Sequence, residues 1–425
     1  MQNAYDVLSE RGFVYQTTDE DGVRRLLGGE RIACYIGFDP TAASFHVGSL
    51  VPIMALAHIQ RSGHRPIAVV GGGTAMVGDP SGKTEMRQLL TRERIAENAV
   101  GLKGQLSRFI TFGDDQAVMI DNGEWLHEIR YIDFLRDFGR HFSVNRMLTA
   151  ESVKLRLETG LSFLEFNYML LQAYDFYHLC RSHDCLLQMG GQDQWGNIVA
   201  GIELIRRTLQ REAFGVTFPL LTDGSGQKFG KTEAGAVWLD PALTSPYAFY
   251  QFWRNTDDAD VARLLGLFSF LPMEEVQRLA RVEGNMLNRA KEILAFEVTS
   301  IVHSPKAAKE AYSASIAKFG LSDPEGKVET SSAIKDVLGA KEDLLPTVTL
   351  PAADLTEGIW APKLFVSAGL CKSNGDARRL IQGGGAYIND QRVDAVDLTV
   401  GEDMLEDGAL TLRAGKKRYC RVVFE

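Results

Sequence analysis

The fold is decided by one stretch of the chain, residues 31–70, which reads RIACYIGFDPTAASFHVGSLVPIMALAHIQRSGHRPIAVV. Its two ends, Arg31 to Phe38 and Pro66 to Val70, are short apolar runs that predict buried strands. Between them apolar residues recur at helical spacing. Pro52 falls in the first turn, where proline is tolerated, and Gly63 can end the helix. A strand, a helix and a strand at this length form a βαβ unit, so we expect a parallel α/β sheet.

The composition is typical of a globular protein. Of the 425 residues, 45% are apolar and 24% are charged. No apolar stretch reaches the roughly 18 residues of a membrane span, and the polar residues 1–12 predict no secretory signal. Five scattered cysteines predict free thiols in a reducing, cytoplasmic compartment. Because the net charge is −9, any RNA binding must come from a local basic patch.

The chain is too long for one ordinary domain, and its pattern changes along its length. The α/β pattern covers residues 1–245, and helical periodicity follows over 246–322. Residues 323–356 are polar and contain prolines, so we expect a linker there. Residues 357–425 form a last small domain.

A glycine-rich segment, Val69 to Thr84, follows the second strand. It does not match a P-loop, because the first required glycine falls on Val77, and it lacks the third glycine of a dinucleotide fingerprint. A loop at the carboxyl edge of a parallel sheet still suits ligand contact, and this one carries Asp79, Lys83 and Arg87.

Two other segments are candidates for phosphate binding. After the first strand, Thr41 and His46 precede the helix, where backbone N–H groups favour anions, and Gly48 allows close approach. The alternative is an ordinary βα turn. Far along the chain, Lys228 and Lys231, with Thr232, lie in a glycine-rich loop that can clamp a polyphosphate. Taken alone, such a loop is more often an ordinary surface loop.

Together these two segments resemble the signature motifs of class I aminoacyl-tRNA synthetases, and the chain resembles the bacterial tyrosyl-tRNA synthetases nearly from end to end. The supporting segments are YIGFDPT at 35–41, GDPS at 78–81, YMLLQAYD at 168–175 and GGQDQWGN at 190–197. Two departures stand out. Ser49 replaces the second histidine that the first motif often has, and Phe229, Gly230 and Thr232 replace the usual Met, Ser and Ser of the second.

A polar stripe crosses the largely apolar segment from Phe163 to Leu179. Tyr168, Gln172 and Asp175 are spaced to lie one above another on a helix and must find hydrogen-bond partners, either in the protein or in a ligand. The resemblance implies a tyrosine ligand, with Tyr35 and Asp175 at its phenol. It also implies the remaining contacts: Tyr168, Gln172 and Asp79 at the ammonium, Gln194 at the reacting carboxylate, and Gly191 and Asp193 at the adenosine ribose.

The resemblance implies a Rossmann-like catalytic domain with an inserted connective segment, then a helical domain on the anticodon side and a small α+β RNA-binding module. Its activity would be the two-step attachment of L-tyrosine to tRNA(Tyr), through a tyrosyl-adenylate made from ATP with Mg²⁺. The resemblance also implies a homodimer formed through the insertion. It implies no tightly bound metal and no binding to a membrane. The implied catalytic residues are His46, Thr41, Lys83, Arg87, Lys228, Lys231 and Thr232. The implied ATP contacts are Asp39, His46, Gly48, Ser49, Gly191, Asp193, Lys228 and Lys231.

In the last domain, basic and acidic side chains lie in separate parts of the sequence. Such a separation indicates an RNA-binding surface, and charged side chains that contact only solvent are the alternative. Helices are predicted over 362–368 and 376–382, and a strand over 386–388. The pattern resembles a small RNA-binding module first known from a ribosomal small-subunit protein. The candidate RNA contacts are Lys363, Lys372, Arg378, Arg379, Lys416, Lys417 and Arg418.

The sequence also allows a zinc site and other functions to be considered. The cluster His178, Cys180, His183 and Cys185 matches no common zinc spacing, and the chain has no G-x-S-x-G elbow. A tryptophanyl relative is disfavoured by the pairing of Tyr35 with Asp175 and by the C-terminal module. A nucleotidyltransferase would not need that module, and a non-catalytic RNA-binding relative would not need the lysine loop.

Overall fold

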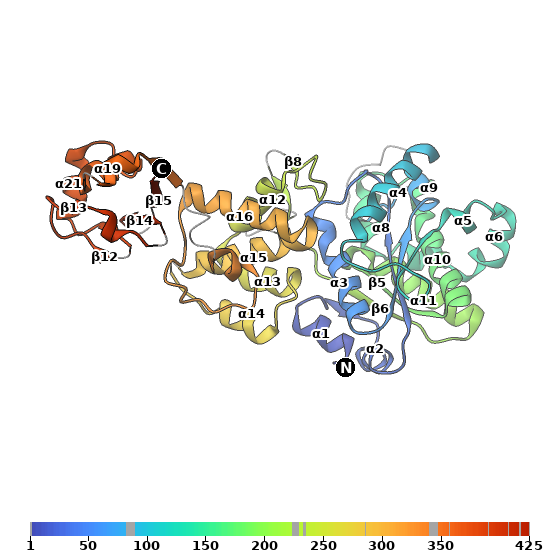
Figure 1. The fold of residues 1–425 in the computed structure, drawn as a ribbon. Helices are drawn as coiled ribbons and strands as arrows, with labels where there is room; N and C mark the ends of the chain where they lie inside the picture. Colours follow the sequence, from blue (N-terminus) through green and yellow to red (C-terminus); the bar gives the residue numbers. More distant parts are fainter. Residues whose placement is uncertain are drawn as a thin grey trace. The chain divides into compact units, whose positions relative to one another are not determined.

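The computed structural model describes residues 2–81, 90–222, 229–232, 235–284, 286–339, 347–356, 358–389, 391–406, 408–415 and 418–424 (Figure 1). The chain forms two compact units. The first contains residues 1–245, 257–276 and 301–304, and the second contains 246–256, 277–300 and 305–425. Within the described ranges, no helix has both the length and the apolar character needed to cross a bilayer.

A six-stranded sheet forms the centre of the first unit, in the order β1-β6-β5-β2-β3-β4. All neighbouring strands are parallel except β1 with β6. The strands are β1 Gln16–Thr17, β2 Ala33–Phe38, β3 Arg65–Val70, β4 Val118–Asp121, β5 Cys185–Gly191 and β6 Phe214–Phe218. The side chains of β2 and β3 are almost all buried, as expected for strands covered on both faces. The predicted parallel sheet is therefore confirmed.

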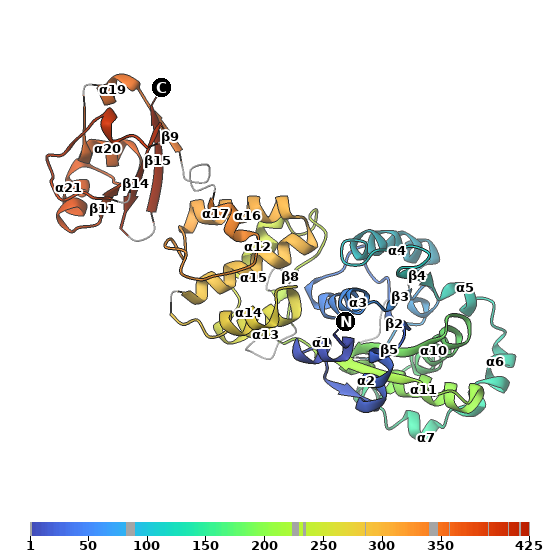
Figure 2. The same ribbon diagram turned by 60° about the horizontal axis from the view of Figure 1, so that its bottom comes forward.

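Helices cover both faces of this sheet. From β2 the chain passes through α3, Leu50–Arg61, to β3 and through α4, Arg92–Leu106, to β4. From β4 it returns to β5 past α10, Tyr168–His183, and continues through α11, Trp195–Leu209, to β6. Right-handed crossovers place the first pair of helices on one face and the second pair on the other, as Figure 2 shows. The strand order reverses between β2 and β5, where parallel α/β sheets bind ligands.

Three smaller groups of helices complete the first unit. Helices α1, Ala4–Glu10, and α2, Glu20–Gly28, precede β2, and Asp19 accepts a hydrogen bond from the Gly22 N–H at the start of α2. Helix α13, Val261–Phe268, contacts α3. Between β4 and α10 lie five short helices: α5 Gly123–Leu126, α6 Tyr131–Asp137, α7 Val144–Met147, α8 Glu151–Thr159 and α9 Phe163–Phe166.

The described residues between 245 and 320 contain helices and no strand, as their periodicity predicts. They include α12 Pro246–Arg254, α14 Met273–Leu279, α15 Met286–Val302 and α16 Pro305–Phe319. In the second unit, buried Arg289 bonds to Glu292 and to the hydroxyl of Tyr312.

The segment predicted as a linker over 323–356 contains packed structure. Ile334 and Val337 are buried and both lie in α17, Ile334–Gly339, and Leu355 is buried further along the chain. The buried Asp323 carboxylate accepts backbone N–H groups of Lys327 and Val328. The polar composition gave no sign of this packing, because buried apolar residues are few in the described part of the segment.

The C-terminal module begins earlier than residue 357. Strand β9, Thr347–Leu350, pairs in parallel with β15 in a sheet ordered β12-β11-β14-β15-β9. The other strands are β11 Ala386–Ile388, β12 Gln391–Arg392, β14 Ala409–Ala414 and β15 Arg418–Phe424, with a separate pair β10 Ile359–Trp360 and β13 Thr399–Val400. The helices are α19 Ala352–Thr356, α20 Ala361–Ser367 and α21 Asn374–Gln382. Ser373 caps α21 by accepting the Asp376 N–H at 3.2 Å.

Candidate active site

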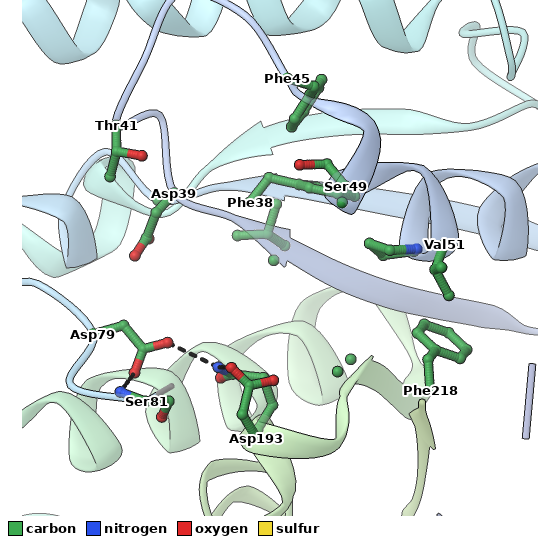
Figure 3. Close-up of a pocket in the computed structure, with 18 of the residues that line it drawn as sticks. Phe38, Asp39, Thr41, Phe45, Ser49, Val51, Asp79, Ser81, Asp193 and Phe218 are labelled. Carbon is green, nitrogen blue, oxygen red and sulfur yellow. Dashed lines mark hydrogen bonds between the residues drawn. The ribbon is translucent and has the colours of Figure 1, made fainter. Parts of the chain in front are cut away.

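A cavity of about 450 Å³ opens where β2 and β5 end, at the reversal of strand order. Figure 3 shows Asp39 and Thr41, which follow β2, on one wall and Asp79 and Asp193 on the opposite wall. Within the described part of the chain, the cavity brings together these predicted site residues: Tyr35, Asp39, Thr41, His46, Gly48, Ser49, Asp79, Tyr168, Gln172, Asp175, Gly191, Asp193 and Gln194.

Tyr35 lies in the middle of β2 with 1% of its surface exposed. Its hydroxyl is buried and has no hydrogen-bond partner among the residues that the structure describes. Burial raises the pKa of Tyr35 well above its ordinary value, and the nearby Asp175 carboxylate raises it further. A buried hydroxyl without a partner is costly, so this side chain is suited to a polar ligand group.

Asp175 lies on the cavity side of α10, with 3% of its surface exposed. The Asn122 amide donates to one carboxylate oxygen at 2.8 Å, and the Trp125 indole N–H donates to the other at 2.8 Å. Burial raises the pKa of Asp175 to about 7, which the two donors partly oppose. The carboxylate is therefore fixed in direction at the inner end of the cavity.

Asn122 and Trp125 are not among the predicted site residues. Asn122 directly follows β4 and Trp125 lies in α5 just after it, so their place at the carboxyl end of a strand is a signal that could have found them. Trp125 is itself held by His178, whose ring stacks on the indole with centroids 4.3 Å apart. Cys180 and Cys185, from the same metal-like cluster, are buried free thiols.

A chain of hydrogen bonds leads from Asp175 toward the other end of the site. Asn122 also donates to the Thr74 hydroxyl at 3.0 Å, and Thr74 donates to Asp39 at 2.9 Å. The second oxygen of Asp39 accepts the Tyr168 hydroxyl at 3.1 Å. Asp39 thus links two predicted tyrosine contacts, Asp175 and Tyr168.

A second chain joins the remaining polar side chains. Asn197 donates its amide to Gln172 at 3.0 Å and to the Gln194 oxygen at 3.1 Å. Gln194 donates in turn to the Asp79 carboxylate at 2.8 Å, a bond drawn in Figure 3. Asp79 also accepts the Ser81 N–H at 2.9 Å, which fixes its direction. Asn197 is a further residue that the sequence analysis did not identify.

The turn after β2 presents His46 and Ser49 to the cavity. His46 Nδ1 accepts the Gly48 N–H at 3.0 Å, so a neutral ring carries its proton on Nε2. A Cβ added at Gly48 would lie 2.8 Å from the imidazole Cε1, so this close turn requires glycine. Ser49 is partly exposed at the start of α3, and its side chain makes no capping hydrogen bond.

The second candidate phosphate motif is anchored beside the first. Gly230 has a φ of +84°, and an added Cβ there would overlap the Val47 side chain, next to His46. The Val237 N–H donates to the Gly230 carbonyl at 3.0 Å, and the Val47 N–H donates to the Val237 carbonyl at 2.9 Å. The backbone of Lys231 and Thr232 forms the short strand β7. Lys83, Arg87 and Lys228, and the side chains of Lys231 and Thr232, lie outside the described residues.

The predicted RNA contacts are on the C-terminal module, in the second unit. Lys363, Lys372, Arg378, Arg379 and Arg418 are exposed. Lys363 pairs with Asp354 at 3.7 Å, Arg379 pairs with Asp376 at 3.7 Å, and the Arg378 guanidinium lies over the Trp360 ring. Lys416 and Lys417 lie outside the described residues.

Comparison with known proteins matches both parts of the chain. The family described as tRNA synthetases class I (W and Y) matches residues 28–320, and a tyrosine--tRNA ligase SYY-like C-terminal domain matches 342–422. A tyrosine--tRNA ligase of Desulfosudis oleivorans is 57% identical over 98% of each chain. One of Syntrophus aciditrophicus is 53% identical over 100% of each chain.

Solved structures give the same likeness for the fold. A C-terminally truncated mitochondrial tyrosyl-tRNA synthetase of Aspergillus nidulans matches with a TM-score of 0.65 and 29% identity, over 73% of this chain and 93% of its own. A tyrosyl-tRNA synthetase of Archaeoglobus fulgidus, solved with L-tyrosine, matches with a TM-score of 0.55 and 18% identity, over 73% of this chain and 99% of its own. At 18% identity, the match to the Archaeoglobus fulgidus structure shows a shared fold and nothing more.

Proposed function

Because the chain belongs to the class I tRNA synthetases, and within them to the tyrosine–tRNA ligases, which attach tyrosine to tRNA with ATP, we propose that the cavity between β2 and β5 is where tyrosyl-adenylate forms. The tryptophanyl alternative is not favoured, since the full-length relatives are tyrosine–tRNA ligases.

One observation carries the placement of the substrate. The buried Tyr35 hydroxyl has no partner in the described part of the chain, and the Asp175 carboxylate is aimed by two donors at the same inner end. A phenol bound there would accept from Tyr35 and donate to Asp175. Phenylalanine would leave the Tyr35 hydroxyl buried and unpaired, which costs about 1–3 kcal/mol, and Asp175 would lose the hydrogen bond from the phenol.

The other end of tyrosine would meet the two hydrogen-bonded chains. We assign its ammonium to Tyr168, Gln172 and Asp79, and its carboxylate to Gln194. The link from Gln172 through Asn197 and Gln194 to Asp79 supports this grouping, because these side chains already hold one another in place. Asp39, Gly191 and Asp193 would contact the adenosine of ATP.

The first step needs alignment and charge neutralisation more than a strong acid or base. The tyrosine carboxylate attacks the α-phosphorus, the bond to pyrophosphate breaks, and negative charge grows on the leaving phosphates. His46 Nε2–H, Thr41 and Ser49 would donate to those oxygens from the turn after β2. On the basis of the sequence alone, we assign the neutralising charges to Lys83, Arg87, Lys228 and Lys231, and a further hydroxyl donor to Thr232. In the second step a terminal ribose hydroxyl of tRNA(Tyr) takes the tyrosyl group and AMP leaves.

Magnesium would enter the site bound to the phosphates of ATP. Among the described residues, no group of three or more His, Cys, Asp or Glu side chains is placed to hold a metal ion. Mg²⁺ in such reactions is held largely by phosphate and water oxygens, which suits a site without a protein cage.

We further assign tRNA binding to the C-terminal module and dimer formation to the insertion between β4 and α10. The insertion exposes several large apolar side chains. More than half of the surface is exposed for each of Tyr131, Ile132, Val144, Leu155, Leu157 and Phe163. A second copy of the chain would cover them. The five buried free thiols support a reducing compartment, the cytoplasm.

The decisive experiment is ATP–pyrophosphate exchange with tyrosine, phenylalanine and tryptophan side by side. Exchange that depends on tyrosine, and that Tyr35→Phe and Asp175→Ala both weaken, is the expected outcome. If both variants kept normal exchange at limiting tyrosine, the phenol would have to bind elsewhere.

A further inference from the structure

The sheet of the C-terminal module has two unlike faces. One face packs into the core of the module through apolar side chains, among them Ile388, Leu410, Leu412 and Val422. Side chains alternate along a strand, so the residues between these point to the other face. Those outward positions carry arginines, tyrosines and threonines.

Four of the outward residues form a continuous row across the sheet. Arg392 is paired with Tyr387, Tyr387 with Arg413, and Arg413 with Tyr419, each directly opposite the next. Directly paired residues point to the same side, so the four side chains alternate arginine and tyrosine on one face. The Arg413 guanidinium carbon lies 3.5 Å from the centre of the Tyr387 ring and 5.9 Å from that of Tyr419.

Beside this row lie Arg421, paired with Thr347, and Val423, paired with Thr349. The outward positions of the described strands β11, β14 and β15 contain no carboxylate, and at the edge of the row Arg392 pairs with Asp394 at 3.0 Å. On the helix side of the module, Lys363 and Arg379 are paired with carboxylates. The sheet face differs from the helix side in carrying aromatic rings between its arginines.

We propose that this face, formed by Tyr387, Arg392, Arg413, Tyr419 and Arg421, binds unpaired nucleotides of the tRNA by stacking. The inference rests on the proposed role of the module in holding tRNA. Aromatic rings and guanidinium planes are the groups on which unpaired bases stack, while arginines also attract the phosphates between them. Paired bases in an RNA helix have no free face, so the surface selects single-stranded segments. The side chains are partly or fully exposed, so a base can reach this face of the sheet.

The test uses the full-length enzyme and a tRNA(Tyr) transcript, with binding measured at several salt concentrations. Tyr419→Leu removes the ring, and Tyr419→Phe keeps it. We expect the leucine variant to bind about fivefold or more weakly, and the phenylalanine variant to bind like the wild type, because one stacked base contributes roughly that much. The salt dependence should not change, since no cation is lost. Thr349→Ala, at an outward position away from the row, is the matched control.

A second pair of probes separates stacking from general RNA affinity. Tyr419→Leu should weaken binding of a single-stranded oligonucleotide and leave an RNA duplex of equal length unaffected. Tyr387→Leu, in β11 on the other side of β14, should repeat this pattern, which guards against a local folding fault in one strand. Equal losses on duplex and single strand would overturn the stacking proposal.

Arg378→Gln, on the helix side, distinguishes this inference from the proposed role of the module. It should weaken tRNA binding and reduce the salt slope by about one. If Arg378→Gln acts and both tyrosine variants are silent, only the stacking face is excluded. If all three are silent, the module is not the tRNA anchor at all.

Discussion

Replacing Asp175 by asparagine should weaken tyrosine activation and stabilise the free enzyme at neutral pH. Burial raises the pKa of this carboxyl from 3.8 to about 7. A group whose pKa is raised by folding stabilises the protein below its unfolded pKa, and that stability is lost as the pH rises through the folded value. At pH 8 the folded enzyme therefore holds a carboxylate that destabilises it, and asparagine removes that charge.

The magnitudes can be set against each other. A shift of about three pKa units corresponds to about 4 kcal/mol of destabilisation above pH 7. Asparagine offers one oxygen to the two donors Asn122 and Trp125, and the unpaired donor costs about 1–3 kcal/mol. The variant should thus gain about 1–3 kcal/mol at pH 8, and the gain should vanish near pH 5. Loss of a charged partner for the phenol should lower kcat/KM for tyrosine about 10- to 100-fold.

Urea unfolding at pH 8, 6.5 and 5 measures the first effect, and ATP–pyrophosphate exchange at limiting tyrosine measures the second. Asp114→Asn, at an exposed carboxylate, controls for the loss of one negative charge. A variant destabilised equally at all three pH values would refute the argument from burial. A variant that activates tyrosine normally would remove Asp175 from the site.

Three further outcomes are expected. Trp125→Phe keeps an aromatic ring but removes the N–H donor to Asp175, so kcat/KM for tyrosine in the exchange assay should fall about tenfold. Gly230→Ala places a Cβ at positive φ and against Val47, so single-turnover adenylate formation should slow while tyrosine affinity, measured by equilibrium dialysis, stays normal. Ending the chain at Gly339 removes the whole C-terminal sheet, so exchange should persist while charging of tRNA, assayed on the same preparation, falls sharply.

Controls decide how these three results are interpreted. Gly104→Ala, in helix α4 with nothing within 4 Å of an added Cβ, should leave adenylate formation normal. If it slowed the reaction as much as Gly230→Ala, the effect would not come from the loop. The ring of His178 stacks on the indole of Trp125. If Trp125→Phe lowered kcat/KM for tyrosine no more than a substitution of His178, the loss of the indole N–H would not be the cause.

The sequence allowed the sheet to be predicted because its information is local. Residues 31–70 contain a whole βαβ unit, and the polar stripe of Tyr168, Gln172 and Asp175 falls on one helix. The resemblance then supplied roles that periodicity alone left open, since a polar stripe can be satisfied by protein groups as well as by a ligand. In the structure Gln172 bonds to Asn197 and Tyr168 bonds to Asp39, so protein groups satisfy these two side chains, and their contacts with a ligand stay a prediction.

The features that could not be predicted from the sequence depend on the order of the strands in the two sheets. Asn122 is 53 residues and Trp125 is 50 residues from Asp175 in the chain, and they reach it only because β4 lies beside β3. Strand β9 likewise joins the C-terminal sheet through β15, more than 70 residues away, so a local polar pattern was read as linker. Pairings between distant segments leave no periodic trace in either partner.

The polar groups of the site form connected chains, and this has a consequence for how the enzyme is dissected. From Trp125 through Asp175, Asn122, Thr74 and Asp39 to Tyr168, each side chain orients the next. The phenol end and the ammonium end of the substrate are thereby coupled through protein groups that would touch neither. Effects of substitutions within one such network do not add, whereas effects at independent sites do. Thr74 is the residue to replace, because its hydroxyl accepts from Asn122 and donates to Asp39. With Thr74→Val, losses caused by Asp175→Asn and by Tyr168→Phe should become additive, and persistent non-additivity would mean that the coupling runs through the substrate instead.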